Sequence, residues 1–279
     1  MTKLFQGARE NKKHVFSAIG LGILFWLVQF AYQYYILVPG EMTSSIVRST
    51  ALTGATLIGA ALLIGPLAKL FPTRNFIQYR RTIGVIGFTF AILHVLSVMF
   101  FFFNFGIAEV LYSLNPYTNP LIFGLLAFVI YIPLYLTSTD WAVEKLNYKR
   151  WKAIHRLVYI AWIFTILHYM QINPNLLYNP VGYLLLGVTY ATLILEFATF
   201  IKYSVEKGGK GKYLGSGVII GTFVLFFLAY YLKQNILVLS LVPITIIGGL
   251  VLYSILKIKQ YMVQKSDIHR YDEVRTEKV

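Results

Sequence analysis

The sequence predicts an all-α integral membrane protein with about eight transmembrane helices. Of its 279 residues, 57% are hydrophobic and only 13% are charged, whereas soluble domains carry about 25% charged residues. Crossing a hydrocarbon core of roughly 30 Å takes about 20 helical residues, and eight apolar runs approach or exceed that length. These runs lie near 15–38, 46–70, 82–105, 120–137, 154–172, 180–201, 214–232 and 235–256.

The first run follows a basic leader, MTKLFQGARENKKH, which is assigned to a cytoplasmic N-terminus of residues 1–14. The apolar core of a signal peptide has about 7 to 15 residues, and the run at 15–38 is longer. We therefore expect it to remain in the protein as a transmembrane helix. The fourth run, 120–137, is short and contains Pro133, so its ends are the least sharply defined.

The basic residues predict the orientation. A net charge of +14 would suggest a nucleic-acid partner in a soluble protein, but 23 of the 25 Lys and Arg residues fall on the side that holds both termini. Only Arg48 and Lys233 lie elsewhere. Because cytoplasmic loops are enriched in Lys and Arg, both termini are predicted to be cytoplasmic, in a plasma (inner) membrane. The charge then indicates topology and contact with anionic membrane lipid, and it does not indicate nucleic acid.

The absence of cysteine excludes disulfides, thiolate-ligated iron–sulfur clusters and covalently attached c-type heme. Any bound metal must therefore be held by His, carboxylate or Met side chains. The polar segment 257–279, assigned to a cytoplasmic tail, is too short for a flavin or nicotinamide domain, and no G-x-G-x-x-G motif follows a strand. If electrons enter this protein, a separate molecule must deliver them.

Three histidines lie within the predicted spans. His94 follows Arg80, at the inner end of the third span, by 14 residues, and His168 follows His155, at the inner end of the fifth, by 13. At 1.5 Å per residue, these intervals correspond to about 21 and 20 Å of depth. Both spans run from inside to outside, so His94 and His168 are predicted at similar height in the outer half of the membrane. Ionisable residues there are candidates for function, and imidazole is the commonest metal ligand in proteins.

We interpret His94 and His168 as the axial ligands of a b-type heme, an arrangement that suits electron transfer because no small molecule can then bind the iron. A single intramembrane histidine can instead hydrogen-bond a neighbouring helix, but two at one depth favour the ligand pair. Heme propionates need cations, and Arg48 lies at the outer height. The basic residues at the inner height are Arg80, Arg81, Lys149 and Arg150. These are either cofactor contacts or ordinary charges flanking the spans.

His155 lies at the inner end, level with Arg80 and Arg81. On an ideal helix, 13 residues leave His155 and His168 about 140° apart. Two stacked bis-histidine hemes would need two histidines in the third span, which offers one. His155 is therefore either a further heme ligand or part of a contact with quinol or flavin, which makes quinone or FMN a candidate second cofactor.

Three segments resemble the ferric reductase-like transmembrane family. They are RSTALTGATLIGAALLIGPLAKLF at 48–71, RRTIGVIGFTFAILHVLSV at 80–98 and TSTDWAVEKLNYKRWKAIHRLVYIAWIFTILHYM at 137–170. The similarity covers roughly residues 45 to 200 and is closest to the heme-binding bacterial branch, the membrane subunits of the periplasmic methionine sulfoxide reductase system. It implies a heme-binding core at 15–201, followed by an additional helix pair at 202–256, because that branch ends after about six spans.

By position, the resemblance implies that His94 and His168 ligate a b heme and that His155 is associated with heme. It also implies electron flow from a cytoplasmic-side donor, quinol or a flavin reductase, to an extracytoplasmic reductase partner. The sequence thus predicts an electron-transfer subunit of an oxidoreductase. The alternatives are a ferric or cupric metalloreductase with the same core, and a transporter or structural membrane subunit without a cofactor.

Overall fold

The computed structural model describes residues 12–71, 77, 79–116, 118–172 and 179–207. The chain divides into two compact units, Met1–Thr189 and Tyr190–Val279, and the candidate site lies in the first. The predicted spans 214–232 and 235–256 and the predicted tail 257–279 lie outside the described residues.

The described chain is helical and contains no strand. The helices are α2 (Lys12–Tyr32), its π-helical continuation η1 (Gln33–Leu37), α3 (Met42–Leu70), α4 (Tyr79–Phe103), α5 (Ile107–Val110), α6 (Leu121–Leu136), α7 (Asp140–His155), α8 (Val158–Ile172) and α9 (Pro180–Lys207). Five stretches among them are long and apolar enough to cross a membrane, and α6 is a shorter apolar helix. The prediction of an all-α membrane protein is confirmed, and each of the first six predicted spans coincides with one of these helices.

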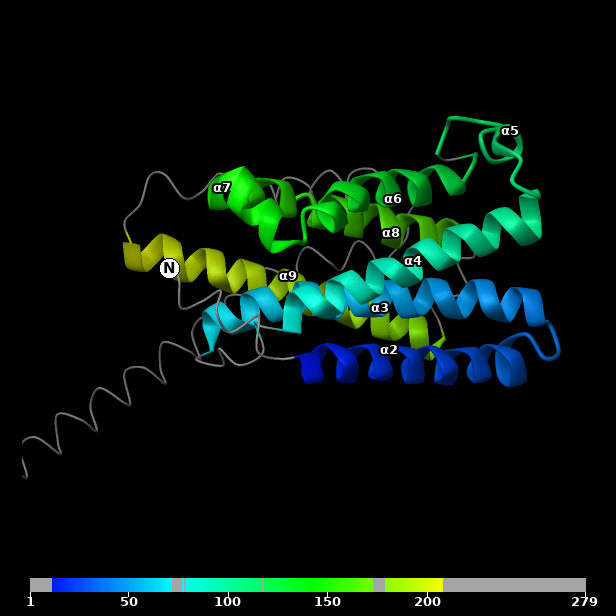
Figure 1. The fold of residues 1–279 in the computed structure, drawn as a ribbon, viewed down its shortest axis with the longest axis horizontal. Coiled ribbons are helices and arrows are strands. Elements are labelled where there is room, and N and C mark those ends of the chain that lie inside the picture. Colours follow the sequence, from blue (N-terminus) through cyan, green and yellow to red (C-terminus); the bar gives the residue numbers. More distant parts are fainter. Residues whose placement is uncertain (1–11, 72–76, 78, 117, 173–178, 208–279) are drawn as a thin grey trace, which may run out of the picture. The chain divides into compact units, whose positions relative to one another are not determined.

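Helices α3 and α4 form a closely packed antiparallel pair (Figure 1). A Cβ atom added to Gly54 of α3 would lie 3.0 Å from the Gly87 carbonyl oxygen of α4, and one added to Gly87 would lie 2.9 Å from the Ile58 nitrogen. Small residues let helix backbones approach in lipid, where packing rather than the hydrophobic effect drives association. The glycine contact therefore fixes how residues of α3 and α4 face one another along the whole pair.

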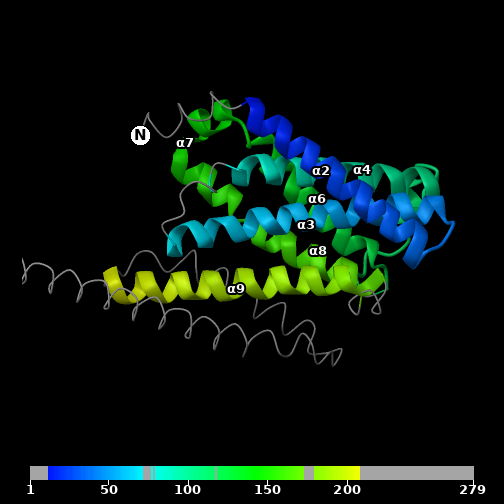
Figure 2. The ribbon, with the colours of Figure 1, turned by 90° about the horizontal axis from the view of Figure 1, so that it is seen from below.

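Helices α6 and α8 form a second closely packed pair. Trp162 of α8 is 1% exposed and lies against Gly59 of α3, where an added Cβ would be 2.8 Å from the indole ring. The indole nitrogen of Trp162 donates a hydrogen bond to the Thr189 hydroxyl (3.1 Å). The contact of Trp162 with Gly59 links the α6–α8 pair to α3. Helix α2 runs beside α3 and α4 (Figure 2) and exposes an apolar surface, as a lipid-facing helix does.

The segment after Thr137, expected as a connection, is helical instead. Its Lys, Glu, Ala and Arg residues favour helix, and the Thr139 hydroxyl caps α7 by accepting from the Ala142 amide (3.2 Å). The interval from His155 to His168, counted on one ideal helix of the predicted span 154–172, is interrupted by a turn at Arg156–Leu157 between α7 and α8. The azimuth of 140° between His155 and His168 assumed a continuous helix, so that angle no longer follows from residue counting alone.

Candidate functional site

His94 of α4 and His168 of α8 face one another across the first unit. Their ring centroids are 6.5 Å apart and the ring planes are inclined by 61°. The two imidazoles come from different helix pairs, which the sequence separates by 74 positions. The structure thus brings together the two histidines that were expected at equal depth. We call them the outer pair.

Each imidazole of the outer pair is held by a main-chain carbonyl through Nδ1. The distances are 3.0 Å from His94 Nδ1 to the Val47 oxygen and 2.9 Å from His168 Nδ1 to the Pro120 oxygen. A carbonyl oxygen can only accept, so Nδ1 must carry the proton in both rings. In a neutral imidazole the lone pair then lies on Nε2. Both histidines are therefore held as the tautomer that offers Nε2 as a ligand.

The α3–α4 contact places Val47 beside His94. Seven residues make about two helical turns. Val47 lies seven residues before Gly54 in α3, and His94 lies seven residues after Gly87 in α4. Because the two helices are antiparallel, the alignment that brings Gly54 next to Gly87 also brings Val47 next to His94. Val47 contributes only its carbonyl oxygen, so no side-chain pattern could have predicted this partner.

Two residues near the start of α6 place His168. Fully buried Asn119 donates to the carbonyls of Val110 (2.8 Å) and Ser113 (3.0 Å) and accepts from the Leu121 amide (3.1 Å), which fixes the backbone around Pro120. One turn later, a Cβ atom added to Gly124 would lie 2.9 Å from His168 Nδ1. The glycine therefore lets the imidazole lie directly against the backbone of α6.

Arg48, predicted at the outer height, is half-buried near the start of α3. It interacts electrostatically with Tyr169, the residue that follows His168. Within the described residues it forms no ion pair with a carboxylate. The positive charge of Arg48 can therefore bind an anionic group close to the outer pair.

At the end of α4 away from His94, predicted to be the inner side, a different set of side chains lies together, which we call the inner group. It consists of Arg80 of α4, Thr137 at the end of α6, and Trp151 and His155 of α7. Arg80 Nε donates to the Ala61 carbonyl of α3 (3.1 Å). Its guanidinium lies across Gly65, where an added Cβ would be 3.0 Å from Nη1. Ala61 and Arg80 lie two turns from the Gly54–Gly87 contact, on the side opposite Val47 and His94.

His155 is held by a side chain through Nε2, which lies 3.1 Å from the Thr137 hydroxyl oxygen. That hydroxyl donates its single proton to the Pro133 carbonyl (2.6 Å), so it accepts from His155 Nε2–H. The free lone pair of His155 is then on Nδ1, the opposite nitrogen from the outer pair. The ring of Trp151 packs against the imidazole, with centroids 4.2 Å apart, and the charges of Arg80 and Arg81 both act on His155.

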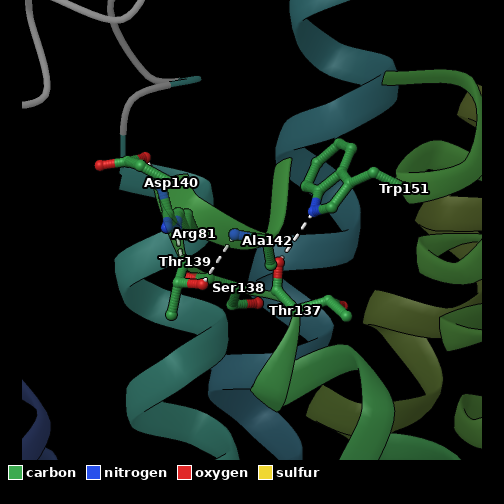
Figure 3. A network of polar contacts seen from close by, with 7 residues as sticks. All are labelled: Arg81, Thr137, Ser138, Thr139, Asp140, Ala142 and Trp151. Carbon is green, nitrogen blue, oxygen red and sulfur yellow. Dashed lines mark hydrogen bonds and ion pairs between the residues drawn. The ribbon is translucent and has the colours of Figure 1, made fainter. Parts of the chain in front are cut away.

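The turn that carries Thr137 is fixed from two helices (Figure 3). Arg81 of α4 donates from Nε to the Ser138 carbonyl (2.6 Å) and pairs with Asp140 through Nη1 (2.5 Å). The indole of Trp151 in α7 donates to the Thr137 carbonyl (2.9 Å). The ion pair is partly exposed and contributes little energy on its own. Its effect is to position the turn, so Arg81 is committed to protein contacts.

The other inner candidates lie on α7. The side chains of Lys149 and Arg150 are exposed, and their amide groups donate to the side-chain oxygen of Asn147 (3.1 and 3.2 Å). Sequence reasoning did not single out Gly124, Thr137 or Trp151. Thr137 and Trp151 lie inside the segment that resembles the family. The only sequence signal for Gly124 is that it is a glycine within an apolar run.

The family described as ferric reductase like transmembrane component matches residues 47–166, which include all four members of the inner group and His94. The protein-methionine-sulfoxide reductase heme-binding subunit MsrQ of Enterobacter sp. (strain 638) is 32% identical over 179 residues, 63% of this chain and 87% of that protein.

MsrQ of Herminiimonas arsenicoxydans is 35% identical over 138 residues, 48% of this chain and 61% of its own length. The magnetosome protein MamZ of Magnetospirillum gryphiswaldense is 32% identical over 116 residues, 41% of this chain and 18% of its own length. The match to these two relatives therefore spans less than two thirds of each. No solved structure matches. The extent of the match to the Enterobacter protein shows that this chain belongs to the ferric reductase-like transmembrane family, together with the MsrQ proteins.

Proposed function

We propose that this protein binds a b-type heme through His94 and His168 and carries electrons across the membrane. The observation that supports the proposal most directly is the outer pair, two imidazoles from separate helices that face one another with Nδ1 of each fixed by a carbonyl. Such an outer-shell bond sets the tautomer and ring orientation of metal-ligating histidines. The names of the MsrQ relatives describe heme-binding subunits, which is consistent with this assignment.

The donor set fits heme better than a bare metal ion. A metal–imidazole bond is about 2 Å long, so two imidazoles on opposite sides of one metal have ring centres roughly 6 Å apart, close to the 6.5 Å observed. Among the described residues, no group of three His, Cys, Asp or Glu side chains converges on one point. A metal at the outer pair would therefore take two protein ligands, and a porphyrin supplies the other four.

The chain's own residues would hold, orient and protect the cofactor. Bound heme supplies one-electron redox chemistry. His94 and His168 would both hold the heme iron, which would exclude water and small ligands from the metal. The Val47 and Pro120 carbonyls keep the imidazoles in one orientation, so little rearrangement accompanies a change of charge. Arg48 is assigned to a heme propionate, because it lies beside Tyr169 in a span and forms no ion pair within the described residues.

We assign the inner side to electron input and the outer side to output. The donor is a quinol or a cytoplasmic flavin reductase, and the acceptor is an extracytoplasmic reductase of the methionine sulfoxide reductase type. The positive charge of Arg80 in the inner group suits an anionic or polar donor at that side. The MsrQ relatives are named as heme-binding subunits of a protein-methionine-sulfoxide reductase, which supports the choice of acceptor.

The proposal is tested by purifying the full chain in detergent and recording its absorption before and after dithionite. We expect a Soret band that shifts and sharpens on reduction, and a pyridine hemochrome spectrum of heme b. A colourless protein from cells supplied with heme would refute the proposal and favour a transporter or structural subunit. Reoxidation of the reduced protein by a ferric chelate, but not by an extracytoplasmic methionine sulfoxide reductase, would instead identify a metalloreductase.

A further inference from the structure

A strongly charged surface on α7 has no part in the heme proposal. The exposed basic side chains, which we call the cationic face, are Lys145, Lys149, Arg150 and Lys152 of α7 and Arg156 directly after it. The acidic residues of this helix are Asp140, which pairs with Arg81, and Glu144. The face therefore keeps a net positive charge where α6 ends and α8 begins (Figure 1).

Large aromatic side chains accompany the charges. Trp141 is 68% exposed and Tyr148 is 57% exposed, although both lie on the most polar of the described helices. The Lys152 ammonium lies 5.6 Å from the centre of the Tyr148 ring. Trp and Tyr gather at the boundary between membrane and water, and basic residues interleaved with aromatic ones are typical of helices that lie in that boundary.

A break in α7 separates this surface into two segments. Asn147 has φ 54° and ψ 158°, a backbone conformation that glycine normally adopts, and Tyr148–His155 begins a new helical segment. The Asn147 side chain accepts from the amides of Lys149 and Arg150. Those amides are therefore satisfied within the protein, and an anion at this surface must be bound by the basic side chains themselves.

The second segment has two functional faces. Lys149, Arg150 and Lys152 are exposed on one. Trp151 and His155 form the other, and both hydrogen-bond Thr137. Any partner that fixes the position of the basic side chains will also restrict the Trp151 and His155 rings, because a helical segment of this length moves as one piece.

We propose that the cationic face of α7 binds the phosphate headgroups of anionic phospholipids, and that this binding stabilises the inner group. The charge is complementary to an anionic headgroup, the exposed aromatic rings match the membrane boundary, and the face lies at the ends of two apolar helices. The proposal does not depend on heme, since it concerns the surface of α7.

The test compares lipid binding by the full-length protein and a K149Q/R150Q/K152Q variant. Native mass spectrometry of protein titrated with phosphatidylglycerol or phosphatidylcholine measures the preference between the two lipids. A basic residue near an anionic surface strengthens association by roughly fivefold, so the triple variant should bind phosphatidylglycerol on the order of a hundredfold more weakly. The matched control is K207Q/K210Q/K212Q, which removes the same charge from a segment that the sequence assigns to the same side of the membrane.

Hydrogen exchange in nanodiscs tests the link to the inner group. Replacing phosphatidylcholine by phosphatidylglycerol should slow exchange at residues 147–156 in the unaltered protein and in the control, but not in the K149Q/R150Q/K152Q variant. Equal loss of phosphatidylglycerol binding in both triple variants would overturn the proposal in favour of unspecific attraction. Unchanged lipid preference combined with loss of reduction by a cytoplasmic flavin reductase would overturn it in favour of a protein-docking surface.

Discussion

The outer pair and the inner group lie at opposite ends of α4 and of the stretch formed by α7 and α8, yet their chemistry differs. At the outer end, α4 and α8 each present a histidine with Nδ1 held by a carbonyl. At the inner end, α4 presents Arg80, and the histidine of α7 is held through Nε2 by a hydroxyl. The backbone geometry is similar at both ends, since α3 supplies a carbonyl partner to α4 in each case.

The difference shows that helix packing determines where a side chain of α4 meets a carbonyl of α3. The type of that side chain then determines what the site can bind. Val47 and Ala61 both offer their carbonyl to α4, 14 residues apart. The imidazole that meets this carbonyl keeps a free Nε2, whereas the guanidinium that meets it offers no lone pair at all. Four tests by substitution address the comparison, from the largest expected effect to the smallest.

Removing either member of the outer pair should abolish heme binding at that end. His94→Ala and His168→Ala each leave one axial ligand, so we expect loss of the dithionite-sensitive Soret band in both. His155→Ala is the matched comparison, and it should retain most of the absorbance. Equal loss in all three variants, measured by pyridine hemochrome per mole of protein, would show that the two ends do not act separately.

Separating α3 from α4 should disturb both ends together. In Gly54→Leu, the new side chain must displace the Gly87 carbonyl, and overpacking of this kind costs about 1–3 kcal/mol or more. We expect a lower melting temperature in detergent and weaker heme absorbance. Gly20→Leu is the control, because an added Cβ there has nothing within 4 Å. A Gly54→Leu variant as stable as this control would mean that the glycine contact does not set the alignment.

A methyl group at Gly124 should act on the outer pair alone. In Gly124→Ala, the Cβ would approach His168 Nδ1 to 2.9 Å and push the imidazole away from the Pro120 carbonyl. We expect reduced heme occupancy and an altered reduced spectrum, without the stability loss of Gly54→Leu. Gly187→Ala, where an added Cβ meets nothing within 4 Å, should leave the spectrum unchanged. An unaltered spectrum for Gly124→Ala would indicate that His168 is not held against α6.

Removing the Thr137 hydroxyl should have the smallest effect on stability, and the effect should be limited to the inner group. Thr137→Val keeps the shape but leaves His155 Nε2–H without its acceptor, which costs about 1 kcal/mol for a hydrogen bond of this kind. The melting temperature should fall slightly while the heme spectrum stays the same. Thr89→Val is the control, because the exposed Thr89 hydroxyl bonds only the carbonyl one turn earlier in its own helix. A spectral change in Thr137→Val would connect His155 to the outer pair.

Much of the fold and the meeting of the outer pair could be predicted from the sequence, because span length and depth follow directly from residue counts. The intervals from Arg80 to His94 and from His155 to His168 were enough to place both histidines at one height. The partners of these histidines could not be predicted in this way. Val47 and Pro120 act through carbonyl oxygens, which every residue possesses, so only helix packing shows which ones are in reach.

The inner group was harder to predict for a different physical reason. The apolar and basic pattern of Lys149–Met170 continues across Arg156 and Leu157 without a glycine or proline, so the turn between α7 and α8 has no local signature. Likewise, Arg80 and Arg81 are adjacent and chemically alike, yet one lies along α3 and the other fixes the turn after α6. Adjacent helical residues point about 100° apart, and only the arrangement of neighbouring helices assigns a partner to each.

The glycine contact between α3 and α4 also has a consequence for the inner end. Since Gly54 and Gly87 fix the alignment for two turns in both directions, the side chain at position 80 is directed toward the Ala61 carbonyl, which Arg80 reaches through Nε. A mutation at this position changes the ligand chemistry of the inner end without rebuilding the helices around it. An Arg80→His variant would place an imidazole beside this carbonyl and is a direct way to ask whether one substitution gives the inner end a metal ligand.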